Sequence, residues 1–160
     1  PPAVVAVAAL AAFGAHAARL WGWQPWKVAR VPLVAVLHAA MAWVALHLLL
    51  RAVAAMGWVS PSVATHALTV GGIGTITLGM MTRTALGHTG RRLHAGRLEV
   101  AAYVLVSVAA VVRVLVPLAW PAALMGAVQV SGWLWALAFG LYAWGYAPIL
   151  GRPRADGRPD

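Results

Sequence analysis

Five long apolar runs, each nearly free of charge, constrain this chain more than any other feature. They cover roughly residues 3–18, 33–53, 62–82, 100–117 and 122–147. A helix needs about 20 mostly apolar residues to cross a bilayer. In lipid it also satisfies its own backbone hydrogen bonds within one segment. The pattern predicts an all-α, polytopic transmembrane helix bundle of five spans over residues 1–151, with a short basic tail over 152–160.

The composition excludes several function classes. Hydrophobic residues make up 62% of the chain and charged residues 9%, whereas soluble domains average about 45–50% and about 25%. The sequence contains no Cys, and its acids are Glu99, Asp156 and Asp160. Thiolate metal sites and carboxylate-pair catalysis are therefore disfavoured, and a metal would have to use His, Met or a carboxylate. Nucleic-acid binding fits poorly despite the net charge of +9, because the basic residues lie in short connections.

The basic residues predict the topology. Counted from the first connection to the tail, the connecting segments carry three, one, four, no and three Lys or Arg residues. Basic residues concentrate in cytoplasmic loops, so we expect the first and third connections and the C-terminus in the cytoplasm. The N-terminal end is then outside. Because the sequence opens with Pro1-Pro2 and no Met, we also expect further transmembrane helices upstream of it.

Small residues recur at every fourth position of the third run, at Ala67, Gly71, Thr75 and Gly79. Such a row lets a neighbouring helix approach closely within a membrane. Ser60-Pro61 is typical of a helix start, with Ser as the N-cap. The small row predicts tight packing, either within this chain or against a partner subunit.

A basic segment follows the third run. We predict a tight turn in which Gly87 and Gly90 flank His88 and Thr89, with exposed backbone N–H groups. The arginines beside this turn are Arg83, Arg91 and Arg92. The segment would suit an anion such as a haem propionate or a lipid phosphate. The alternative is a basic loop that rests on anionic lipid.

The stretch from 66 to 91, HALTVGGIGTITLGMMTRTALGHTGR, resembles the NnrS family of bacterial inner-membrane proteins. Leu37-His38 and Trp43 before it, and the tail YAPIL at 146–150, extend the resemblance. One departure is Ile76, where the family pattern leads us to expect Met. Family members are longer, so the resemblance implies that this chain is the C-terminal part of a multi-pass protein of the bacterial inner membrane.

The resemblance implies a membrane protein that contains haem b and copper and is linked to nitric oxide metabolism and nitrosative stress. It leaves open whether the protein catalyses a reaction. Two alternatives remain at this point. The first is a cofactor-free permease for a small solute or anion, and the second is a membrane assembly subunit.

Depth in the predicted spans sorts the candidate ligands into two groups. An outer group contains His47 and His66, and an inner group contains His38, His88 and Met81. Haem takes axial His, and copper accepts His and Met. Each histidine also has a structural alternative as a packed or solvated side chain.

Arg113 is a charge inside the fourth predicted span. A charge in lipid is costly and needs a partner or a route to the surface. Three alternatives are open for its guanidinium: extension to the outer interface, a hydrogen bond to Gln129, or a contact with a haem propionate. Of these the sequence favours the propionate, with Arg83 and Arg91 as further candidates for anionic groups of a cofactor.

Overall fold

The computed structural model describes residues 1–157, and every regular element in that part is a helix. The longer α-helices are α1 (Pro2–Gly22), α3 (Pro32–Ala55), α5 (Thr75–His88), α6 (Arg97–Ala119) and α7 (Leu124–Leu150). The shorter elements are α2 (Pro25–Val28), α4 (Pro61–His66), the π-helix η1 (Ala67–Gly74) and the 3-10 helix η2 (Pro121–Ala123). The predicted all-α class is confirmed for these residues.

Five continuous helical stretches are long and apolar enough to cross a membrane, as predicted. The third consists of α4, η1 and α5, which follow one another without a break from Pro61 to His88. It runs six residues past the predicted end at 82, because a drop in hydropathy marks the end of lipid contact and not the end of a helix. The orientation of the ends relative to a membrane stays a prediction.

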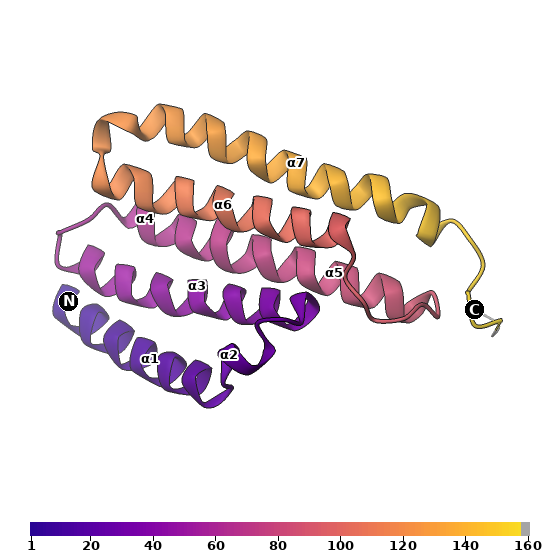
Figure 1. The fold of residues 1–160 in the computed structure, drawn as a ribbon. Coiled ribbons are helices and arrows are strands. Elements are labelled where there is room, and N and C mark those ends of the chain that lie inside the picture. Colours follow the sequence, from indigo (N-terminus) through magenta and orange to yellow (C-terminus); the bar gives the residue numbers. More distant parts are fainter. Residues whose placement is uncertain (158–160) are drawn as a thin grey trace.

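The helices lie side by side in the order α1, α3, α5, α6 and α7 (Figure 1). α3 packs between α1 and the third stretch, and α6 packs between that stretch and α7. The third stretch is therefore the most buried of the five, while α1 and α7 are the least buried. On α7, Trp133 and Trp144 are 78% and 75% exposed. Such apolar outer faces suit contact with lipid.

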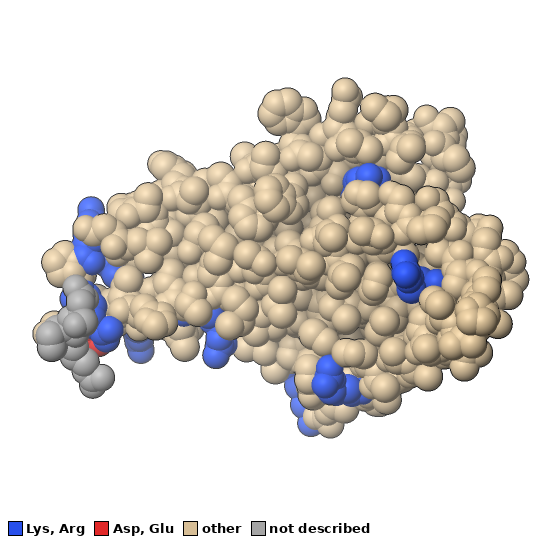
Figure 2. Space-filling model, turned by 180° about the vertical axis from the view of Figure 1, so that it is seen from behind, with Lys and Arg blue, Asp and Glu red and all other residues tan. Residues whose placement is uncertain are grey.

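The bundle has two unlike ends. One end, here called the basic end, carries the 23–31 connection, the 89–96 loop and the C-terminal tail (Figure 1). The other, here called the Trp58 end, carries the N-terminus and the 56–60 connection. Figure 2 shows one group of Lys and Arg side chains near the C-terminal tail, a second group at the lower edge of the bundle, and isolated ones elsewhere on that face. The basic connections that the topology prediction grouped together thus share one end of the molecule.

The row of small residues in the third stretch packs against α3 of the same chain. Ala67, Gly71, Thr75 and Gly79 are all buried. A Cβ atom on Gly71 would overlap the ring of Trp43, and one on Gly79 would lie 2.8 Å from a methyl carbon of Val36. The predicted tight packing is confirmed, and its partner is an internal helix.

The π-helix η1 occupies the middle of the third stretch and was not predicted. In a π-helix each N–H bonds five residues back, so a turn holds more residues than an α-turn. A row spaced by four residues drifts by about 40° per step around an α-helix. The wider turns of η1 reduce that drift, which keeps the row from Ala67 to Gly79 on the face that meets α3.

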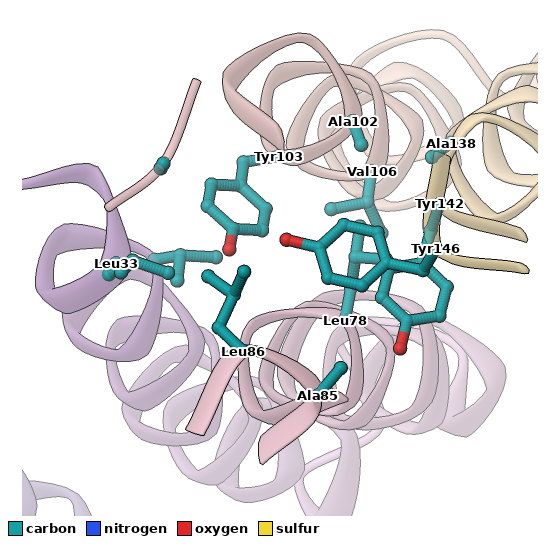
Figure 3. Close-up of a cluster of buried hydrophobic side chains, with 12 residues drawn as sticks. Leu33, Leu78, Ala85, Leu86, Ala102, Tyr103, Val106, Ala138, Tyr142 and Tyr146 are labelled. Carbon is teal, nitrogen blue, oxygen red and sulfur yellow. The ribbon is translucent and has the colours of Figure 1, made fainter. Parts of the chain in front are cut away.

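Three tyrosines join the helices near the basic end (Figure 3). The rings of Tyr142 and Tyr146 stack with centroids 4.5 Å apart. The Tyr146 hydroxyl donates to Glu99 Oε1 at 2.9 Å, and the Tyr142 hydroxyl donates to the carbonyl of Met81 at 3.3 Å. α7 is thereby hydrogen-bonded to both α6 and α5. The third ring, Tyr103, is buried in the same cluster.

Candidate functional site

His38 lies in the second turn of α3, towards the basic end. Its Nδ1 atom is 2.9 Å from the carbonyl oxygen of Val34, one turn earlier. A carbonyl only accepts, so Nδ1 carries the proton and Nε2 keeps its lone pair. The ring of Trp23, at the end of α1, meets the imidazole edge to face at 5.9 Å. This arrangement fixes both the tautomer and the orientation of His38.

A cavity of about 490 Å³ opens beside His38. It is here called the His38 pocket, and its lining residues are Trp23, Val34, Leu37, His38, Met41, Ile76 and Met80. Met41 follows His38 by one turn on α3, while Met80 comes from α5. The side chains of one histidine and two methionines therefore line a cavity whose other walls are apolar.

This donor set fits a soft metal. Imidazole nitrogen and thioether sulfur are ligands of copper, and His and Met are both axial ligands of haem iron. Metal-binding histidines commonly donate their second N–H to a backbone carbonyl, as His38 does to Val34. Within residues 1–157, no group of three His, Cys, Asp or Glu side chains could hold a metal. The methionines are thus what makes the His38 pocket a candidate.

The predicted inner group of His38, His88 and Met81 does not form as one cluster. Met81 packs against the buried core, and its neighbour Met80 lines the His38 pocket instead. Adjacent helical residues point about 100° apart, so the two side chains meet different neighbours. His88 lines a different cavity, of about 410 Å³, which also contains Arg83, and the two cavities share Met80.

The predicted turn around His88 is partly wrong. α5 continues through Gly87 and ends at His88, and the turn is made by Gly90 with φ of +67°. The C-terminal tail covers this turn. Arg154 donates to the carbonyl of His88 at 2.9 Å, and a Cβ atom on Gly90 would meet the carboxylate of Asp156. The place predicted for an external anion is therefore held by a carboxylate of the chain itself.

The arginines of this region differ in their contacts. Arg91 Nη1 donates to the carbonyl of Thr89 at 3.3 Å, which ties it to its own loop. Arg83 and Arg154 line the cavity that contains His88. These side chains keep the basic end positively charged, as the sequence analysis expected.

At the Trp58 end, His66 and Arg113 contact each other. Arg113 Nη2 is 2.9 Å from His66 Nε2, and His66 Nδ1 is 2.7 Å from the carbonyl of Ser62. The carbonyl makes Nδ1 the donor, so Nε2 accepts from the guanidinium and the imidazole is neutral. The sequence analysis did not consider this partner for Arg113. A separation of 47 residues gives no local signal for it.

His47 and His66, predicted as an outer pair, face different neighbours. His47 lies on α3, and its Nδ1 atom donates to the carbonyl of Ala64 at 2.7 Å. His66 lies two residues beyond Ala64 and turns to Arg113 on α6. His47 therefore fastens α3 to α4, whereas His66 fastens α4 to α6.

Three side chains of the candidate sites were missed by the sequence analysis: Met41, Trp23 and Ser62. The spacing of Met41 three residues after His38 is a signal that could have been used, since such residues share a helix face. For Trp23, which caps the end of α1, no local pattern gives such a signal. Ser62 contributes mainly its backbone carbonyl, for which no residue type is required.

The membrane-length helices and the few polar side chains held between them define an integral membrane protein of the polytopic helix-bundle class. Within that class, the chain belongs to the NnrS family, whose family model, described as NnrS protein, matches residues 1–154. The predicted resemblance is thus confirmed over nearly the whole chain. No curated protein and no solved structure matches it.

Proposed function

We propose that this chain is part of a haem- and copper-containing protein of the bacterial inner membrane that responds to nitric oxide, and that the His38 pocket holds one metal centre. The observation that carries the proposal is that His38, whose Nε2 atom keeps its lone pair, lines one cavity together with Met41 and Met80. Membership in the NnrS family and the membrane-length helices support it.

Each lining residue has a chemical task in this proposal. His38 supplies a nitrogen ligand whose tautomer is set by Val34, and the two methionines supply soft sulfur ligands. The remaining walls are aliphatic or aromatic and limit water around the site. A copper or haem iron bound there would supply a redox-active centre able to bind nitric oxide.

The test uses the full-length protein, purified in detergent, with metal analysis and an absorption spectrum recorded before and after addition of nitric oxide. The wild-type protein should contain copper or haem and change its spectrum with nitric oxide. His38→Ala should lose most of one metal. His94→Ala is the matched control, because His94 lies in the 89–96 loop outside this pocket.

Two results would contradict the proposal. A colourless, metal-free wild-type protein would favour the permease alternative. Equal metal content in His38→Ala and His94→Ala would place the metal elsewhere. Met41→Leu with Met80→Leu separates the metals, since loss of copper alone assigns the sulfurs to copper.

A further inference from the structure

Arg113 carries a positive charge that no carboxylate within residues 1–157 contacts. Its guanidinium is half-buried on α6, and its bonded partner, His66 Nε2, is neutral. Of the carboxylates in the described residues, Glu99 bonds Tyr146 and Asp156 bonds Arg154, both at the basic end. An unpaired charge in a membrane protein is costly and marks a functional site by default.

Arg113 lines a cavity of about 320 Å³. This cavity is here called the Arg113 pocket. Its walls include Trp58, Pro121 and Leu124, and its polar lining includes Ser60 and Ser62. Ser60 Oγ accepts the backbone N–H of Ser62 at 3.3 Å, so its own hydroxyl hydrogen remains available to donate. The volume lies at the small end of the range for ligand cavities.

We propose that the Arg113 pocket binds a small planar oxyanion, of the size of nitrite or a carboxylate group. Guanidinium has five N–H donors in a planar fork that matches two oxygens of such an anion, and His66 uses one of them. The serines add neutral donors to the lining of the same cavity. The neutral tautomer of His66 holds the guanidinium at the cavity without cancelling its charge.

The pair of oxygens that the guanidinium fork would hold has three candidate sources: a free planar anion, the tetrahedral phosphate of a lipid, and a propionate of a haem. The test separates them.

Full-length protein is placed in nanodiscs of phosphatidylcholine, and its thermal midpoint is measured with sodium nitrite, sodium acetate and, at equal ionic strength, sodium chloride. Nitrite and acetate should raise the midpoint more than chloride, and Arg113→Gln should lose that difference. Arg51→Gln is the control, because Arg51 is an exposed cation on neighbouring α3, outside this pocket.

Arg113→Lys keeps the proposal testable if Arg113→Gln does not fold. Lysine keeps the charge but lacks the planar fork, so preference for nitrite and acetate over chloride should fall at least fivefold in apparent affinity. A shift that needs phosphatidylglycerol in the nanodisc, and needs Arg113, assigns the oxyanion to lipid. An Arg113-dependent shift seen only in haem-free protein assigns it to a propionate. Equal shifts in wild type, Arg113→Gln and Arg113→Lys, or none under any condition, overturn the proposal.

His38→Ala distinguishes this proposal from the proposed function. That variant alters the other pocket, so it should keep the Arg113-dependent response to nitrite. If the metal assignment fails, the anion proposal is unaffected. If the anion proposal fails, the metal assignment is unaffected.

Discussion

The His38 pocket and the Arg113 pocket share one local hydrogen bond, made by a histidine to its own helix. The ligands that we propose for them differ, a metal for the first and an anion for the second. In each, an imidazole donates Nδ1–H to the carbonyl four residues earlier, Val34 for His38 and Ser62 for His66. In the first, Nε2 belongs to a residue lining a cavity with two thioethers, and in the second it accepts a hydrogen bond from Arg113. The environment of Nε2, more than the histidine itself, therefore decides whether a metal or an anion is favoured.

The largest expected effect tests this contrast directly. His38→Ala should lower bound metal by about ten- to a hundredfold, because it removes a ligand outright. His66→Ala should leave the same metal within about twofold, since Arg113 already occupies its Nε2 lone pair. Metal analysis of the two variants, side by side, decides the matter. Equal losses would erase the distinction between the pockets.

A second experiment tests how closely the third helical stretch packs against α3, the helix that carries His38. Gly71→Ala should destabilise the protein by about 2 kcal/mol, because the added methyl would overlap the ring of Trp43 on α3. Gly140→Ala meets nothing within 4 Å and should change stability by less than about 0.5 kcal/mol. Thermal unfolding in detergent measures both. Similar behaviour of the two variants would count against close packing of the small row.

The role of the thioethers gives a smaller effect. Met80→Leu keeps the volume of the side chain but removes the sulfur, so copper affinity should fall about fivefold, or about 1 kcal/mol. Met56→Leu serves as the control, because Met56 is 53% exposed at the far end of α3. A competition titration with a copper(I) chelator reports the difference. Unchanged affinity in Met80→Leu would leave His38 as the sole ligand contributed by this pocket.

The smallest effect concerns the framework beside the His38 pocket. Tyr146→Phe removes the hydrogen bond to Glu99 and should destabilise the protein by about 1 kcal/mol. Tyr103→Phe should cost less, because within residues 1–157 the Tyr103 hydroxyl makes no well-formed hydrogen bond, and the hydroxyl of nearby Thr82 donates to the carbonyl of Leu78. The midpoints of thermal unfolding should therefore separate the two variants. The opposite order would mean that Glu99 is held mainly by the N–H of Gly96.

Features that depend on neighbouring residues in the chain were predictable. Hydropathy over about 20 residues identified the five spans, and Ser60-Pro61 marked a helix start that the structure confirms. Contacts between helices were harder, because they depend on how each helix is rotated and shifted along its neighbour. The sequence gives no such information for Met80 against Met81, or for Arg113 against His66. The tail contact of Arg154 with His88, 66 residues apart, lies beyond local patterns for the same reason.

The π-helix η1 has a consequence for both pockets. His66 lies immediately before it, while Ile76 and Met80 lie after it on the same continuous helix. The winding of these eight residues therefore sets the rotation about the helix axis between His66 and the residues that line the His38 pocket. Each residue of an α-helix contributes about 100° of rotation, and each residue of a π-helix contributes less, so conversion of η1 to regular α-helix would rotate everything beyond it relative to His66. One helix thus joins the two pockets mechanically, and the segment between them sets their relative orientation.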